Sequence, residues 1–260
     1  MHDQFMMQQW RETGQLLKGH GRTLVALVLL LVGPLLCLDA LAVLVLGLAP
    51  DDADKGIGLL NVLLMPVLNG CIVWILHRGY QGERPSLWAA LQAATTYWSR
   101  LFVAYVGVSL ITLAWLVATV LPAYIGMAMF KIQQPYLLIP FGLVGLVLAL
   151  PRFAFIDPVV VIEGLSPFYA RQRSAALVKS RRWTVLGCGA VAYALPLCLE
   201  LAGEGLPDLL GLDARSTGLA LSLSVGLASA LLYVVPIVFF YTYYRALAVT
   251  PAAIEPKEQL

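Results

Sequence analysis

Three polar side chains interrupt long apolar stretches of this chain, and they are the first candidates for chemistry. Asp39, Asn69 and Glu200 each lie within a different apolar stretch. A charged group inside such a stretch is costly, so it is retained either for function or because it reaches water. Two carboxylates of this kind can relay protons or bind a cation. The simpler interpretation, which we favour, is that Asp39 and Glu200 reach water at the outer surface, which leaves Asn69 as the deeper candidate for a polar pathway.

A second group of candidates surrounds the end of another apolar stretch. Arg152 and Asp157 lie between Pro151 and Pro158, and further arginines follow them along the chain. A helix end broken by proline can present backbone N–H groups and a guanidinium to a phosphate. The sequence therefore predicts a site for a phospholipid headgroup, formed by Arg152, Asp157, Arg171, Arg173 and Arg182. The alternative is a local ion pair at the membrane edge, in which Glu163 can also take part.

The sequence contains no set of residues typical of catalysis or metal binding. There is no histidine–acid–serine arrangement, phosphate-binding loop or nucleotide fingerprint. The histidines are isolated from one another, at His2, His20 and His77. The cysteines form no CxxC pair and all lie in apolar stretches, where cysteine behaves as a small apolar residue, at Cys37, Cys71, Cys188 and Cys198. We therefore predict no enzyme activity, no catalytic residue, no metal site, no disulfide and no cofactor.

The composition is that of a membrane protein. Of the 260 residues, 60% are hydrophobic and 12% are charged, whereas soluble domains average about 25% charged residues. Several apolar runs exceed the roughly 18 residues that mark a membrane-spanning helix. We predict an all-α integral membrane protein with six transmembrane helices, at Leu24–Leu48, Ile57–Leu76, Leu101–Pro122, Tyr136–Ile156, Trp183–Ala202 and Gly218–Tyr244. A net charge of +2 gives no reason to expect a nucleic-acid partner.

Lysine and arginine residues are concentrated on one side of these six spans. Only Lys55, Lys131 and Arg215 fall on the other side, together with a group of carboxylates. Because basic loops stay in the cytoplasm, both termini are predicted to be cytoplasmic. The first apolar span is much longer than the about 7–15 residues of a signal-peptide core, so we expect it to be retained as a membrane helix.

The spacing of several residues predicts a threefold repeat within one transmembrane domain, residues 1–260. Lys18, Arg100 and Arg182 are separated by 82 residues each time, and three prolines in the return spans by 85, at Pro66, Pro151 and Pro236. Each unit would contain an interfacial helix and two spans, over residues 1–82, 83–164 and 165–260. The second interfacial helix is predicted to begin after Ser86 as its N-cap.

Two stretches resemble a known family. "WRETGQLLKGHGRTLVALVLLL" is similar to the opening of the YciC-type bacterial inner-membrane proteins, and "FIDPVVVIEGLSPFYARQRSAALVKSRRW" is similar to their central segment. A looser likeness extends to the membrane domains of some glycerophosphodiester phosphodiesterases. The resemblance implies a multi-pass protein of the bacterial inner membrane with an envelope role, and it supplies no catalytic residues.

Two functions follow as hypotheses. The first, which we favour from the sequence, is a non-catalytic component of envelope or lipid homeostasis that binds phospholipid, or docks a protein partner, at its basic cytoplasmic face. The second is a small transporter or channel with a pathway near Asn69, Asp39 and Glu200. The sequence leaves the ligand, the partner and the oligomeric state open.

Overall fold

The structure is a computed structural model that describes residues 2–47, 50–130, 134–209 and 219–248. Within these ranges the chain forms α-helices and two short 3-10 helices, and no strand. Six helical segments are long and apolar enough to cross a membrane, at Met6–Leu44, Leu60–Tyr80, Leu87–Met129, Tyr136–Ile162, Arg182–Gly203 and Leu223–Ala248. The prediction of an all-α membrane protein with six spans is therefore confirmed.

The first two predicted interfacial helices are continuous with the spans that follow them. Helix α1 (His2–Leu31) includes the first of these helices and the beginning of its span, and the 43-residue helix α4 (Leu87–Met129) runs through the second and all of its span. Helix α4 begins where expected, because the Ser86 side chain accepts a hydrogen bond from the Ala89 backbone N–H at 3.2 Å. Only the third interfacial helix, α7 (Pro167–Val178), is separate from its span, α8 (Arg182–Leu209).

Prolines interrupt three of the spans. Helix α1 gives way to α2 (Gly33–Leu44) just before Pro34, and α9 (Leu219–Leu232) gives way to α10 (Val234–Ala248) just before Pro236. Between α5 (Ile139–Ala149) and α6 (Ile156–Ile162), the 3-10 helix η2 (Leu150–Phe153) contains Pro151. Proline lacks the backbone N–H that a continuous helix needs and clashes with the preceding turn, which explains each interruption.

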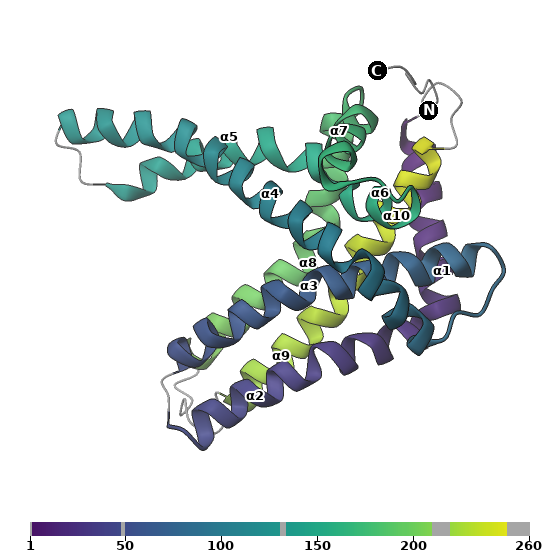
Figure 1. The fold of residues 1–260 in the computed structure, drawn as a ribbon. Coiled ribbons are helices and arrows are strands. Elements are labelled where there is room, and N and C mark those ends of the chain that lie inside the picture. Colours follow the sequence, from purple (N-terminus) through teal and green to yellow (C-terminus); the bar gives the residue numbers. More distant parts are fainter. Residues whose placement is uncertain (1, 48–49, 131–133, 210–218, 249–260) are drawn as a thin grey trace.

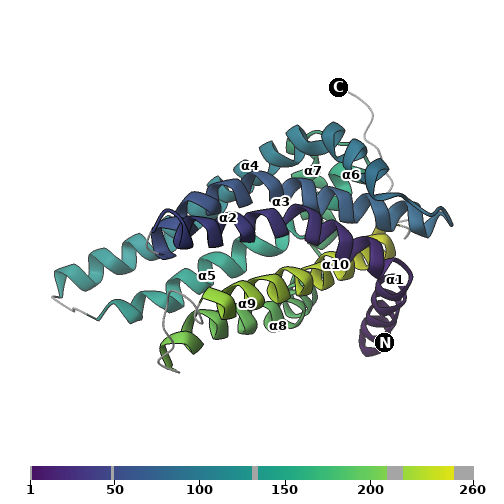
Figure 2. The ribbon, with the colours of Figure 1, turned by 90° about the horizontal axis from the view of Figure 1, so that it is seen from below.

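The helices form two arms that diverge from a common end (Figure 1). One arm is the hairpin of α4 and α5, joined through the 3-10 helix η1 (Pro135–Leu138). The other arm contains α2, α3 (Pro50–Tyr80), α8 and α9. Seen from below, α2 and α3 form one layer of this second arm, and α8 and α9 form the other, which continues into α10 (Figure 2).

The hydrophobic core lies at the end where the arms converge, among α1, α3, α6, α7 and α10. The largest fully buried side chains there include Leu24, Leu27, Ile72, Ile75, Leu76, Leu101, Phe155, Phe239, Tyr241 and Tyr243. By the distribution of basic residues this is the predicted cytoplasmic end. The halves of the helices that point away from it expose their apolar side chains, as lipid-facing helices do.

The N-terminal part of α1 packs against α10. The Trp10 and Phe239 rings are 4.6 Å apart between centroids, and the Thr13 and Thr242 hydroxyls lie 3.2 Å apart. The apolar side chains of this segment, which include Met6, Trp10 and Leu17, pack against the core. The protein core therefore covers these apolar side chains, which would also suit a membrane interface.

Small residues allow close packing of α4 against α5, as expected for helices in lipid. Gly145 and Ala149, which are four residues apart and so share one face of α5, are both buried. A Cβ atom on Gly145 would lie 2.7 Å from Thr119 Oγ1 and 3.2 Å from the Trp115 carbonyl oxygen. The backbones of the hairpin therefore approach so closely that only glycine fits at this position.

Candidate functional site

A half-buried polar network joins three spans. The Tyr105 hydroxyl of α4 donates to both carboxylate oxygens of Asp157, at 2.9 Å to Oδ1 and 3.0 Å to Oδ2. The Asn69 amide of α3 donates to Asp157 Oδ2 at 3.2 Å and also to the Tyr105 hydroxyl oxygen. An ionised carboxylate only accepts hydrogen bonds. Hydrogen bonds from two donors on two other helices therefore compensate for the hydration that the Asp157 carboxylate loses.

The break after α5 is what turns Asp157 toward these partners. Asp157 lies in the first turn of α6, directly after the interruption at η2. The Phe155 backbone N–H, which has no partner within the helix at this point, donates to the buried Ser174 hydroxyl of α7 at 3.1 Å. This bond fixes the start of α6 against α7, and so fixes the direction in which Asp157 projects.

A cavity of about 530 Å³ adjoins the network within the arm formed by α2, α3, α8 and α9. Its lining residues are Val32, Leu36, Asn61, Met65, Leu68, Asn69, Ile72, Tyr105, Tyr193, Glu200, Gly203, Val225, Gly226, Ser229, Ala230, Tyr233, Val234 and Ile237. From Asn61 to Ile72 the cavity follows α3 for about 16 Å, at 1.5 Å per residue. Asn69 and Tyr105 belong to both the cavity wall and the network, so they connect the cavity to the Asp157 carboxylate.

The part of the cavity that is farther from the core contains a second polar group. The Tyr233 hydroxyl donates to Glu200 Oε2 at 2.9 Å. The rings of Tyr193 and Tyr233 lie 6.0 Å apart between centroids, at an interplanar angle of 56°. Tyr193 and Glu200 line the cavity and are exposed, so the cavity is open along this side of α8.

Toward the convergent end the cavity is closed by the core. Leu68, Ile72 and Val234 line it and are buried, and Leu76 and Val238 beyond them are fully buried.

Two helix interruptions lie in the cavity wall itself. Val32 marks the junction of α1 with α2, and Tyr233 marks the junction of α9 with α10.

The structure brings two of the three predicted intramembrane residues to one cavity. Asn69 and Glu200 both line it, whereas Asp39, which lies on α2, is not among the described lining residues. The sequence analysis did not single out Tyr105, Tyr193 or Tyr233. Tyrosine is common in membrane helices near the interface, so its type alone carried no signal that these hydroxyls face inward.

The predicted headgroup residues are divided between different environments. Arg173 forms an ion pair with Glu163 at 3.3 Å, and Glu163 also accepts a hydrogen bond from the Tyr244 hydroxyl at 2.7 Å. Arg171 lies over the Phe168 ring at 5.2 Å, and Arg182 is exposed at the start of α8. Asp157 lies apart from these arginines, in the polar network described above.

Arg152 lies on η2, half-buried, with its guanidinium 5.4 Å from the centre of the Trp115 ring. Within the described part of the chain no carboxylate forms an ion pair with it, so the alternative of an Arg152–Asp157 pair is not what the structure shows. Its charge is compensated by the aromatic face, which attracts a cation.

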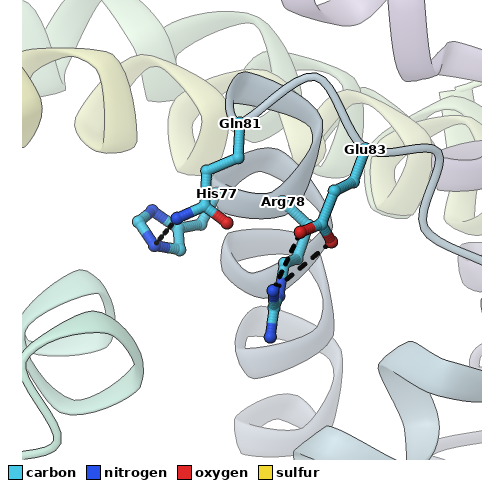
Figure 3. Close-up of polar contacts among 4 residues, drawn as sticks. All are labelled: His77, Arg78, Gln81 and Glu83. Carbon is cyan, nitrogen blue, oxygen red and sulfur yellow. Dashed lines mark hydrogen bonds and ion pairs between the residues drawn. The ribbon is translucent and has the colours of Figure 1, made fainter.

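The convergent end of α3 carries polar contacts that close the following turn rather than form a cleft (Figure 3). Arg78 forms an ion pair with Glu83 at 3.0 Å, and the side chains of His77 and Gln81 lie 3.2 Å apart. Gly82 has a φ of 83°, a conformation that favours glycine. The ion pair is exposed, so it contributes about 0–1 kcal/mol to stability.

Comparisons with protein-family models, with curated proteins and with solved structures find no match to this chain. Among the described residues no three His, Cys, Asp or Glu side chains are grouped as metal ligands would be. The cavity and its polar groups are therefore the features of the described chain that point to a function.

Proposed function

We propose that this chain is a membrane transporter whose substrate site is the cavity between α2, α3, α8 and α9. The observation that carries the proposal is this cavity of about 530 Å³ within the spans, in contact with the Asn69–Tyr105–Asp157 network. Binding sites for small molecules measure about 300–1,000 Å³ and combine an apolar wall with a few polar groups. Ionisable groups at membrane depth also mark substrate or ion pathways.

The distribution of packing supports transport rather than binding alone. The cavity is open along α8 and closed by buried side chains at the convergent end, which is the arrangement of a carrier accessible from one side. The interruptions at Val32 and Tyr233 lie in the cavity wall, and broken helices at the substrate site are typical of transporters. A change of angle at these two points would move α2 and α9 without repacking the core.

Cysteine accessibility tests this proposal. In a background without the four natural cysteines, Ala230→Cys introduces a thiol into the cavity wall, and Ala228→Cys introduces one two residues earlier on α9, outside that wall. The reagent is a membrane-impermeant methanethiosulfonate that carries a trimethylammonium group. Because only the thiolate reacts and apolar surroundings suppress it, we expect modification of Ala230→Cys to be at least about tenfold faster. Equal rates would refute a water-accessible cavity.

A second candidate function is recognition of anionic phospholipid at Arg152. The supporting observation is its half-buried guanidinium, which contacts an aromatic ring and pairs with no described carboxylate. A lipid phosphate would supply the missing anion. We expect Arg152→Gln to reduce the anionic phospholipid that copurifies with the protein, measured by mass spectrometry. The matched control is Arg84→Gln in the exposed turn before α4, and equal lipid content in both variants would count against this role.

The transporter proposal includes a location and an orientation. The concentration of basic residues around the convergent end supports cytoplasmic termini, and the resemblance to YciC-type proteins supports the bacterial inner membrane. In this orientation the cavity is open toward the outer half of the membrane, which is consistent with the carboxylates predicted on that side.

A further inference from the structure

We propose that the cavity selects organic cations that carry their charge on an apolar body, and that Glu200, Tyr193 and Tyr233 hold the charged group. This inference depends on the proposed function, because it names the substrate class of the same cavity.

The charge of the cavity wall is negative. Glu200 is the one residue among the described lining residues that is charged at neutral pH by its ordinary chemistry, and no lysine, arginine or histidine lies among them. Tyr233 occupies Glu200 Oε2, while no described residue donates a hydrogen bond to Oε1. An unoccupied carboxylate oxygen in a cavity without basic groups attracts a cation and disfavours an anion.

Two neighbouring rings of the cavity wall, one of them hydrogen-bonded to Glu200, suit an ammonium group. Tyr193 and Tyr233 both line the cavity, with their centroids 6.0 Å apart and their planes inclined at 56°. Tyr193 is 40% exposed, so part of its ring is available for contact. Aromatic faces attract cations within about 6 Å, and aromatic cages combined with a carboxylate are a usual way to bind quaternary ammonium groups.

The rest of the wall accounts for the apolar body. Val32 at the junction of α1 with α2, Leu36 on α2 and Met65 on α3 line the opposite side of the cavity. Val225 and Ile237 line it on α9 and α10. Burying such a surface against an apolar ligand is favourable by about 25 cal/mol per Å². The volume of about 530 Å³ is large enough for a drug-sized molecule, so the charge at Glu200 and the apolar body can be accommodated together.

A metal ion fits this site less well. Hard cations take about six to eight oxygen ligands, usually with several carboxylates. The described lining residues offer one carboxylate, two amides on α3 and a few hydroxyls spread over the length of the cavity. An organic cation needs only one carboxylate and aromatic faces, which is what the structure provides.

Two isosteric probes test the inference. Binding of tetraphenylphosphonium and of tetraphenylborate to the purified full chain is measured by equilibrium dialysis in lipid nanodiscs, with protein-free nanodiscs as the blank. These ions have the same shape and apolar surface but opposite charge. We expect the phosphonium to bind at least about tenfold more tightly after the blank is subtracted. Equal affinities, or tighter binding of the borate, would overturn the selection of cations.

The residues are tested with matched variants. Glu200→Gln removes the charge and is expected to weaken phosphonium binding about 10- to 100-fold, whereas Glu83→Gln makes the same change in the exposed turn after α3 and should leave it unchanged. Tyr193→Leu removes a ring and should weaken binding about two- to fivefold. If Glu200→Gln binds like the natural protein, Glu200 does not hold the charge and the inference is wrong.

A lipid with an amine headgroup carries the same chemistry as a free organic cation, so the measurement is repeated in two lipid compositions. Equal phosphonium binding in nanodiscs with and without phosphatidylethanolamine assigns the site to a free cation. Competition by phosphatidylethanolamine supports the cation site and names the headgroup as its occupant.

Failure of the inference is distinguishable from failure of the transporter proposal. Fast modification of Ala230→Cys without any preference for the phosphonium would remove only the cation selectivity.

Discussion

The hydroxyl of Tyr105 is the most sensitive point of the polar network, and its removal gives the sharpest test of the site. In Tyr105→Phe the ring is kept, so packing changes little. The Asp157 carboxylate loses the donor that lies 2.9 and 3.0 Å from its oxygens, and the Asn69 amide loses one of its two acceptors. A hydrogen bond to a charged group contributes about 1.5–3 kcal/mol, and this is the loss expected for the half-buried Asp157 carboxylate.

The size of the effect follows from these values. A change of 1 kcal/mol shifts the melting temperature of a chain of this size by about 2–4 °C, so Tyr105→Phe is expected to lower it by roughly 3–12 °C. The control is Tyr124→Phe on the same helix, where the side chain is 58% exposed and the same atom is removed. Its effect should stay within about ±0.5 kcal/mol, as for most surface substitutions.

Thermal denaturation of the purified protein in detergent, followed by size-exclusion chromatography of the fraction that remains folded, measures this difference. All variants are heated at one rate, because irreversible unfolding makes the midpoint depend on the rate. A double-mutant cycle with Asn69→Ala should show non-additivity of about 0.5–3 kcal/mol, since both side chains bind Asp157. If Tyr105→Phe shifts the midpoint no more than Tyr124→Phe, the network described here does not form.

Three further predictions concern the fold. Gly145→Leu should separate α5 from α4, because even a Cβ atom would lie 2.7 Å from Thr119 Oγ1, and the midpoint of thermal denaturation should fall by several degrees. The control is Gly126→Leu, which has open space around its Cβ position and should have a much smaller effect. Ser86→Ala removes the cap of α4 and should cost about 1 kcal/mol, while Ser86→Asp, which can cap equally well, should restore most of it in the same melting assay. A green fluorescent protein fused to the C-terminus should be fluorescent and an alkaline phosphatase fused there inactive, and the opposite pattern would show that the orientation is wrong.

Much of the fold could be predicted from the sequence because it depends on local properties. In lipid every backbone polar group must be satisfied within its own segment, so a long apolar stretch has to be helical. This is why six spans were predicted and found, although α1 and α4 were longer than expected. These two helices can continue because no proline lies between either interfacial helix and the start of its span. The Ser86 cap was also a local effect and was located in advance. The positions of the prolines alone did not locate the interruptions, because Pro66 and Pro122 lie within continuous helices.

The candidate site could be predicted only in part. Asn69 and Glu200 were selected because a polar group in an apolar span is unusual, and both line the cavity. Asp157 was grouped with Arg152 because they are close in the chain, yet its partners Tyr105 and Asn69 are 52 and 88 residues away. Which neighbour a side chain meets depends on how the helices are rotated and where they are broken, and proximity in sequence does not determine either.

By itself, then, the amino-acid sequence determined that this protein consists of long apolar helices and which of their ends carry the basic residues, because hydropathy and charge act locally. It offered several prolines as possible breaks, and the structure decided which of them interrupt a helix. Only the tertiary structure decided that α4 and α5 diverge from the other arm, that Asp157 turns toward Tyr105 and Asn69, and that Glu200 meets Tyr233 at one cavity. These are contacts between helices, and they are set by the close approach that small residues permit and by the angles at the helix breaks.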